Sequence, residues 1–175
     1  KNTLEDVDAL SIAEKLSIKY SFPGYLTEEW ITVFGEDFTE QLLSSLLESP
    51  DFSVRINTLK TSRNALVEEL RNNGIETAPG RFLNEALYIK NVSNISSLDA
   101  FLEGRMTVQD ESSMLVTTVL DPKPDEKVLD VCAAPGGKTT HIGQLMENRG
   151  RIDAWDIYDH KIDLINENAK RLGVE

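Results

Sequence analysis

The sequence predicts an α/β protein. A helical segment (residues 1–50) and a small α+β module (51–109) precede the first β-α-β-α units of a doubly wound parallel sheet (110–175). Apolar residues recur at helical spacing before Pro50, and strand-like and helix-like stretches alternate after it. In addition, a short apolar run, Val128 to Val131, leads into six small or turn-forming residues and then a helix-compatible segment. This order is typical of a strand–turn–helix unit in an open parallel sheet.

The composition is that of an ordinary globular protein. The 175 residues are 40% hydrophobic and 27% charged, which excludes wholesale disorder. No apolar run approaches the roughly 20 residues that span a bilayer. A single cysteine excludes an intrachain disulfide and favours a reducing cytoplasm. The start at Lys1, with neither an initiator Met nor a signal-peptide pattern, suggests a piece of a longer protein.

The charge is strongly acidic, with a net value of −12. On its face this disfavours a nucleic-acid partner. Residues 1–49, however, carry 3 basic and 10 acidic side chains, so the acidity is mostly an N-terminal property. The rest of the chain is close enough to neutral to leave room for a local basic face.

Residues 1–50 are expected to form helices. Leu4, Leu10 and Leu16 belong to a first helical pattern, and Thr27 and Thr39 are the predicted N-caps of two more helices. The pattern is that of a packed helical segment with a solvated acidic face, and it points to no chemistry.

Residues 51–109 are expected to fold as β-α-β-α-β. Strand-like stretches lie at 52–57, 87–89 and 106–109, and helix-like stretches run from about 61 to 73 and from about 96 to 103. Four polar residues cluster along the first strand and its exit: Arg55, Asn57, Lys60 and Arg63. They can form a phosphate-contacting face, since Arg and Lys supply charge-assisted donors, or an ordinary solvated strand face.

Residues 110–175 add a helix, a proline-marked connector and then β-α-β-α. The strands are expected at 127–131 and 151–157, with helices from Lys138 to Met146 and from about Ile162 to Leu172. Two parallel strands cannot cover both faces of a sheet, so this domain is expected to be incomplete. The uncovered apolar surface predicts association, disorder after about residue 125, or rearrangement.

The glycine turn at Cys132–Thr140 admits three ligand classes. Gly137-Lys138-Thr139 matches the end of a phosphate loop, but that motif's first glycine falls on Cys132, and Pro135 removes an N–H donor. A dinucleotide fingerprint requires G-x-G-x-x-G, which is absent. The third class is the methyl donor S-adenosylmethionine, which lacks phosphates and needs close backbone approach together with an acid for its ribose hydroxyls.

Asp156 can supply that acid. It sits at the end of the second predicted strand, 26 residues after Asp130 at the end of the first, near the offset of about 20 residues at which an acid binds a ribose. Adjacent strand ends would bring Asp156 and the turn to one crevice. The alternative is a structural Asp that caps the next helix, although Asp159 is the better candidate for a cap.

These residues carry a family resemblance. The string Val128-Leu-Asp-Val-Cys-Ala-Ala-Pro-Gly-Gly-Lys-Thr-Thr-His141 resembles the donor-binding motif of the RsmB (Fmu/Sun) ribosomal RNA cytosine-C5 methyltransferases. The resemblance extends through nearly the whole chain, in the segments 16–21, 55–60, 104–113 and 168–173.

The resemblance implies S-adenosylmethionine as cofactor and a Rossmann-like methyltransferase domain. The implied partner is small-subunit ribosomal RNA, and no metal or membrane is implied. The module at 51–109 would bind RNA through Arg55 and Lys60. The implied donor-binding residues are Cys132, Ala133, Ala134, Pro135, Gly136, Gly137 and Lys138 of the turn, with Asp156 on the ribose.

The resemblance also implies a catalytic cysteine beside a proline on a later strand, which we expect beyond Glu175. Cys132 lies in the donor loop, so it is not expected to be the nucleophile, and His141 is expected to pack or cap rather than catalyse. We therefore expect a catalytically inactive piece of a cytosine-C5 methyltransferase. The alternative is a non-catalytic RNA-binding or assembly module with a vestigial donor loop.

Overall fold

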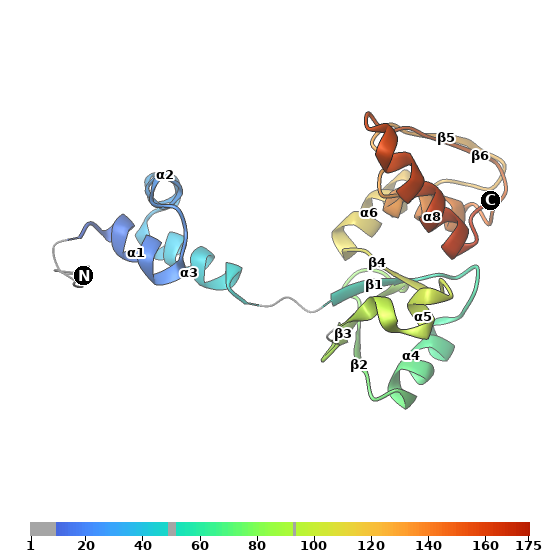
Figure 1. The fold of residues 1–175 in the computed structure, drawn as a ribbon, viewed down its shortest axis with the longest axis horizontal. Helices are drawn as coiled ribbons and strands as arrows, with labels where there is room; N and C mark the ends of the chain where they lie inside the picture. The colour runs from blue at the N-terminus through green and yellow to red at the C-terminus, as the bar shows by residue number, and fades with distance from the viewer. Residues whose placement is uncertain (1–9, 49–51, 93) are drawn as a thin grey trace. The chain divides into compact units, whose positions relative to one another are not determined.

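The structure is a computed structural model and describes residues 10–48, 52–92 and 94–175. Contacts divide the chain into two compact units, Lys1–Pro50 and Asp51–Glu175 (Figure 1). Within the second unit a four-stranded antiparallel sheet precedes two parallel strands with their helices. The predicted α/β class is confirmed. The predicted domain boundaries stay predictions.

Residues 10–48, the described part of the first unit, form the helices α1 (Ile12–Tyr20), α2 (Gly24–Phe34) and α3 (Glu36–Leu46). Ser11 caps α1 in a reciprocal capping box with Glu14. Thr27 and Thr39 are buried inside α2 and α3 rather than at their N-caps, so that prediction was wrong. Both helices begin earlier, directly after Pro23 and Gly35. Leu4, part of the predicted first helical pattern, lies outside the described residues.

The antiparallel sheet has the strand order β2-β3-β1-β4. Its strands are β1 (Phe52–Ile56), β2 (Glu76–Pro79), β3 (Ala86–Lys90) and β4 (Met106–Val108), accompanied by α4 (Arg63–Asn72), η2 (Ile95–Ser97) and α5 (Asp99–Leu102). Val54, Leu66 and Leu87 lie in its core. Strand β2 was not predicted. It is a partly exposed edge strand that ends in a proline and lacks the apolar alternation on which the prediction depends.

The parallel strands are β5 (Lys127–Asp130) and β6 (Arg151–Ala154), paired from Lys127 with Arg151 to Asp130 with Ala154. They alternate with helices α7 (Gly137–Leu145) and α8 (Ile162–Leu172), and α6 (Glu111–Leu120) comes first. A short η3 (Asp159–Lys161) leads into α8. Strand β6 is shorter than predicted, so Asp156 follows the strand by two residues.

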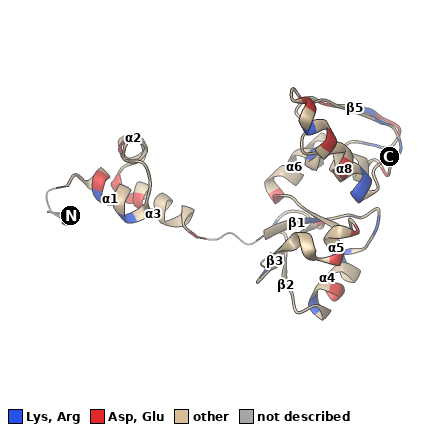
Figure 2. Ribbon diagram, in the orientation of Figure 1, with Lys and Arg blue, Asp and Glu red and all other residues tan. Residues whose placement is uncertain are grey.

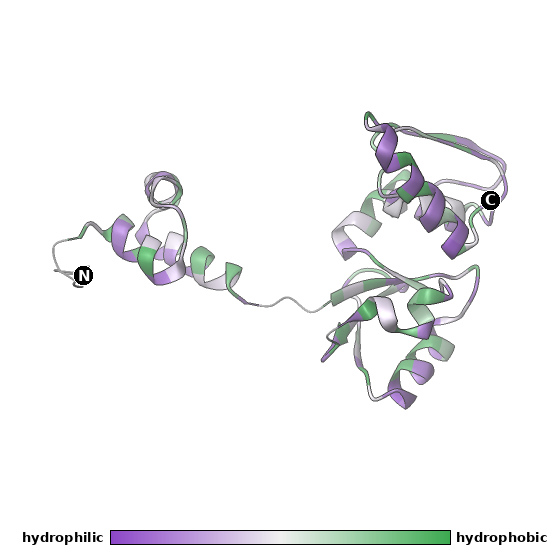
Figure 3. Ribbon diagram, in the orientation of Figure 1, coloured by the Kyte–Doolittle hydropathy of each residue, from purple (hydrophilic) through white to green (hydrophobic). Residues whose placement is uncertain are grey.

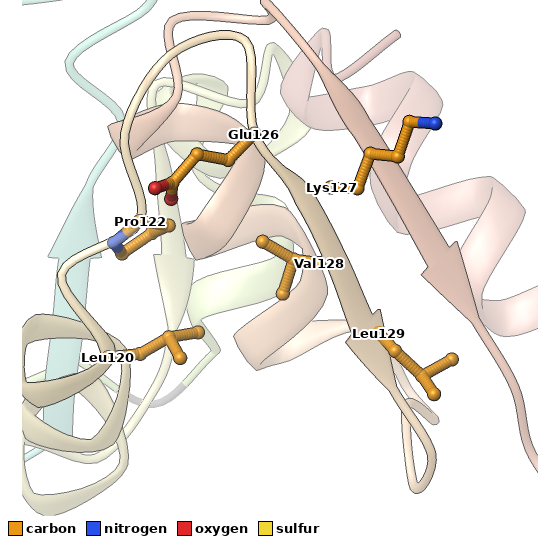
Figure 4. Close-up of a pocket in the computed structure, with 6 residues that line it drawn as sticks. All are labelled: Leu120, Pro122, Glu126, Lys127, Val128 and Leu129. Atoms are coloured by element: carbon orange, nitrogen blue, oxygen red, sulfur yellow. The ribbon is translucent and has the colours of Figure 1, made fainter.

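Apolar side chains remain exposed around the two parallel strands. Leu129, Val131, Trp155 and Ile157 are 53%, 61%, 62% and 87% exposed, and Val119 of α6 is 83% exposed. The hydrophobic segments of this region appear in Figure 3. A hollow of about 430 Å³ lies near the start of β5, and in Figure 4 Val128 points toward Leu120 and Pro122, away from Lys127. The expected uncovered apolar surface is therefore present.

Candidate functional site

The glycine turn lies where the two parallel strands end. The Trp155 N–H donates to the Asp130 carbonyl over 2.8 Å, and the Ala133 N–H donates to the Trp155 carbonyl over 2.9 Å, so the two strand ends stay joined beyond the ladder. Gly136, with φ at +101°, forms the N-cap of α7. This left-handed conformation is one that glycine adopts without steric cost, and it turns the chain from the strand into the helix.

Two carboxylates fasten the turn. Asp130 accepts hydrogen bonds from the Cys132 N–H at 3.3 Å and from the Thr139 hydroxyl at 2.7 Å. Cys132 lies at the start of the turn and Thr139 lies near its end, so Asp130 holds both ends. Asp156 accepts from the Ala134 N–H at 3.1 Å and from the Tyr158 N–H at 3.2 Å. The Tyr158 and Ala134 N–H groups lower the pKa of Asp156, so its carboxylate is ionised at neutral pH.

A hollow of about 190 Å³ opens beside the turn. It is lined by six of the seven predicted turn residues and by three residues between β4 and the first turns of α6: Cys132, Ala133, Ala134, Pro135, Gly137 and Lys138, with Gln109, Asp110 and Ser113. Gly136 is buried, and Asp156 reaches the site through Ala134. Cys132 and Lys138 also line a second hollow of about 280 Å³, together with Asp130 and apolar side chains of α6 and β5.

Sequence reasoning missed Gln109, Asp110 and Ser113 as site residues. They lie in the segment 104–113, which resembles the methyltransferases but contains no local pattern that indicates a ligand site. The missing signal was spatial, because the β4–α6 connection passes beside a turn that lies more than 20 residues later in the chain. Gln109 is 7% exposed and approaches Gly137 closely enough that a Cβ there would lie 3.9 Å from its amide nitrogen.

His141 is fully buried on α7, and its Nε2 lies 3.5 Å from the Glu85 carboxylate. Burial lowers the pKa of His141, although Glu85 opposes the shift, so the ring is neutral at pH 7. It does not line either hollow beside the turn. Cys132 is exposed within the turn.

The predicted RNA contact at Arg55 is wrong for this structure. Arg55 is 1% exposed, and its guanidinium donates to Gln109, Gly137 and Thr140 inside the protein. Asn57 is buried as well. The polar side of β1 is therefore an interior face and not a phosphate-contacting one. Lys60 is exposed and donates to the carbonyls of Glu103 and Arg171, so its contact with RNA stays a prediction.

Basic and acidic residues are mixed over the second unit. Figure 2 shows Lys and Arg interspersed with Asp and Glu along α4 and α8. Over residues 10–48, 52–92 and 94–175, no His, Cys, Asp and Glu side chains gather as a metal site would require. No helix in those same ranges is long and apolar enough to cross a bilayer.

Glu111 joins the loop before β3 to the start of α6. Its carboxylate accepts from the N–H groups of Arg81, Phe82 and Leu83 and from the Tyr88 hydroxyl, at 2.7 to 3.0 Å. Burial opposes ionisation of Glu111, but the N–H donors outweigh it and lower its pKa below the usual 4.5. Glu111 lies next to Asp110, so this cluster also fixes one wall of the hollow.

Replacing Glu111 is expected to remove an acid-sensitive contribution to stability. A carboxylate whose pKa is lowered by folding stabilises the native state above its unfolded pKa and loses that effect as the pH falls through its folded pKa. The native protein is therefore expected to have a higher thermal midpoint of unfolding than Glu111→Gln at pH 7. The difference between the two midpoints is expected to shrink as the pH falls below about 4. Melting curves followed by circular dichroism at several pH values test this; a gap independent of pH contradicts it.

Two family models match the chain. Residues 117–175 match the 16S rRNA methyltransferase RsmB/F, and residues 22–96 match the Methyltr_RsmF/B-like ferredoxin-like domain. The chain belongs to the RsmB/F family. The ferredoxin-like match spans part of both units and crosses the boundary predicted after residue 50.

Named relatives of this RsmB/F chain include a Bacillus subtilis protein, probable ribosomal RNA small subunit methyltransferase B. It is 39% identical over 91% of this chain and 36% of its own length. A methyltransferase homolog from Pyrococcus horikoshii is 31% identical, with a TM-score of 0.80 over 95% of this chain and 55% of its own. NSun6 from Pyrococcus horikoshii, solved with SFG, is 25% identical, with a TM-score of 0.77 over 85% and 62%. The chain thus spans between 36% and 62% of these proteins.

Proposed function

We propose that this chain supplies the methyl-donor site of an S-adenosylmethionine-dependent ribosomal RNA (cytosine-C5) methyltransferase. The observation that carries the proposal is the glycine turn at the joined ends of two parallel strands, bonded to an ionised Asp156, in an RsmB/F chain. Open α/β sheets bind nucleoside-containing ligands at this place. The proposed location is the cytoplasm, in keeping with the single cysteine.

The residues around the turn suit the parts of this ligand. Each carboxylate oxygen of Asp156 accepts one N–H and keeps a lone pair for a ribose hydroxyl. Lys138 lines both hollows beside the turn and offers a positive charge to the ligand's amino-acid carboxylate. Pro135 has no N–H, which makes the turn a poor cradle for a triphosphate. When bound, S-adenosylmethionine supplies an electrophilic methyl group.

Methyl transfer to C5 of cytosine also needs a nucleophile. C5 is unreactive until a thiolate adds to C6 and makes C5 electron-rich. Cys132 is the single cysteine of these 175 residues, and it lines the hollow of about 190 Å³ beside the glycine turn, which is the proposed donor hollow. We propose that residues 1–175 alone bind the donor and transfer no methyl group.

The proposed nucleic-acid partner is small-subunit ribosomal RNA, with Lys60 among its contacts. The name of the Bacillus subtilis relative and the 16S rRNA description of the matching family support this choice. Because the second unit mixes basic and acidic residues, the RNA affinity of this chain is expected to be modest and to fall with salt.

Isothermal titration calorimetry tests the donor site. We expect S-adenosylmethionine to bind with measurable heat and ATP–Mg²⁺ to give none. Binding of ATP–Mg²⁺ alone would replace the proposal with a phosphate-loop protein. Binding of 16S rRNA without S-adenosylmethionine would favour the non-catalytic module. Incubation with radiolabelled donor and 16S rRNA is expected to leave the RNA unlabelled, and incorporation of label would refute the inactivity of these residues.

A further inference from the structure

Arg55 links the antiparallel sheet to the glycine turn. It lies on β1, and its buried guanidinium donates to three residues from later in the chain. One terminal nitrogen donates to the Gln109 amide oxygen at 2.6 Å and to the Gly137 carbonyl at 2.8 Å. The other donates to the Thr140 hydroxyl at 3.0 Å. One side chain therefore fixes the first turn of α7 and a residue that lines the donor hollow.

The charge of Arg55 is poorly compensated. Its hydrogen-bond partners are neutral groups, and Glu85 is the carboxylate whose field acts on it. Burial lowers the pKa of Arg55 to about 9, which leaves it charged at neutral pH. A helix N-terminus already carries partial positive charge, so a cation beside the first turn of α7 does not stabilise that helix. The charge suits an anionic group held in the turn.

A second set of hydrogen bonds reaches the turn from the other side. Arg171 of α8 donates to the carbonyls of Phe101 and Met106 and to the Asn168 amide oxygen. The Asn168 amide nitrogen then donates to the Pro135 carbonyl at 2.8 Å. The carbonyls on both sides of Gly136 are thus held by networks that begin at the antiparallel sheet or its neighbouring segments.

We propose that Arg55 is a positioning residue of the donor site, which holds the glycine turn in place for the amino-acid part of the methyl donor and adds positive charge beneath it. This rests on the proposed function. The antiparallel module then forms part of the donor site as well as a surface for RNA. Arg55 does not touch the ligand itself; it acts through Gly137, Thr140 and Gln109.

Two ligands separate this role from general stabilisation. S-adenosylmethionine carries the amino-acid part, and 5′-methylthioadenosine lacks it. Each is titrated by calorimetry into the native chain, Arg55→Met and the control Asn57→Ala. Asn57 is also buried and spans the same junction, but the two hydrogen bonds that its amide nitrogen donates go to the carbonyls of Gly104 and Leu172 and not to the turn.

Arg55→Met removes the three hydrogen bonds that hold Gln109, Gly137 and Thr140, together with the charge beneath the turn. It is expected to weaken the binding of S-adenosylmethionine about tenfold and to change the binding of 5′-methylthioadenosine less than about threefold. Asn57→Ala is expected to change the affinity for either ligand less than about threefold, even if it lowers the thermal midpoint of unfolding as much as Arg55→Met does. Equal losses for both ligands, or equal losses in both variants, overturn the positioning role.

A variant that keeps the charge covers the case in which Arg55→Met does not fold. Arg55→Lys retains a cation of similar reach but loses the two-pronged geometry of the guanidinium. We expect it to weaken S-adenosylmethionine selectively, by a smaller factor than Arg55→Met. Native affinity for both ligands in Arg55→Lys refutes the geometric role. A native chain that fails to bind S-adenosylmethionine overturns the proposed function and this inference together, whereas native binding with unchanged variants overturns the inference alone.

Discussion

Gly104→Ala is expected to destabilise the second unit by about 4 kcal/mol or more, in the range reserved for severe steric conflicts. Gly104 has φ at +71°, which already costs an alanine roughly 1–2 kcal/mol. In addition, a Cβ at this position would lie 1.9 Å from the Arg171 carbonyl oxygen at the end of α8. The backbone fixes the position of the Cβ, and the carbonyl is itself a backbone group, so neither can rotate away. The module and α8 would have to separate, which would also break the Asn57 hydrogen bonds to Gly104 and Leu172.

Gly74→Ala is the matched control for Gly104→Ala. Its φ is +74°, but nothing lies within 4 Å of the added Cβ. It therefore carries the backbone strain without the collision, and a loss of only about 1–2 kcal/mol is expected. Chemical denaturation followed by circular dichroism measures both variants. Similar losses would show that the contact between Gly104 and α8 is not tight in solution.

Asp156→Asn is expected to reduce the affinity for S-adenosylmethionine by about 10- to 100-fold, because a neutral amide replaces a charged acceptor for the ribose hydroxyls. The substitution keeps the shape of the side chain. The amide oxygen can still accept one backbone N–H, so the turn is expected to keep its place. Calorimetric titration compares the variant with the native chain at neutral pH, where Asp156 is ionised because its N–H partners lower its pKa.

Asp153→Asn controls for the loss of a charge on the same strand. Asp153 lies on β6, where it is bonded to the exposed Arg151, and it does not line the hollows beside the turn. Its replacement is expected to leave donor affinity within about twofold of the native value, since an exposed pair of this kind contributes little. If Asp156→Asn binds the donor as tightly as Asp153→Asn does, Asp156 is only a structural link between the turn and the segment after β6.

The strand–turn–helix geometry of the glycine turn could be predicted because its signals are local. A short apolar run, a glycine with positive φ and a helix start are all encoded within a few consecutive residues, and Asp156 follows from the rule that parallel strands end at one edge. The predicted starts of the helices in the first unit were less accurate. Pro23 and Gly35 allow α2 and α3 to begin before Thr27 and Thr39, the residues that resemble N-caps.

The role of Arg55 could not be predicted from its strand. Alternation along β1 correctly places Val54 and Ile56 in the core, and it assigns Arg55 to the opposite face. Whether that face meets water or protein depends on what packs there, and here it meets Gln109, Gly137 and Thr140 from later in the chain. The two-residue alternation of a strand shows which face of the sheet a side chain occupies, but not what packs against that face. Lys60 lies beyond the end of β1, where these later residues do not cover it, and it is exposed.

The backbone contact between Gly104 and Arg171 limits how these proteins can be recombined. A chimera that takes the antiparallel module from one relative and α8 from another would combine two surfaces that do not fit each other's backbone. Because Asn57 and Lys60 bond to carbonyls of α8, and Arg171 bonds to carbonyls near β4, the fit depends on backbone position more than on side-chain identity. Functional exchange between relatives is therefore expected only when residues 51–109 and the last helix are transplanted as one piece.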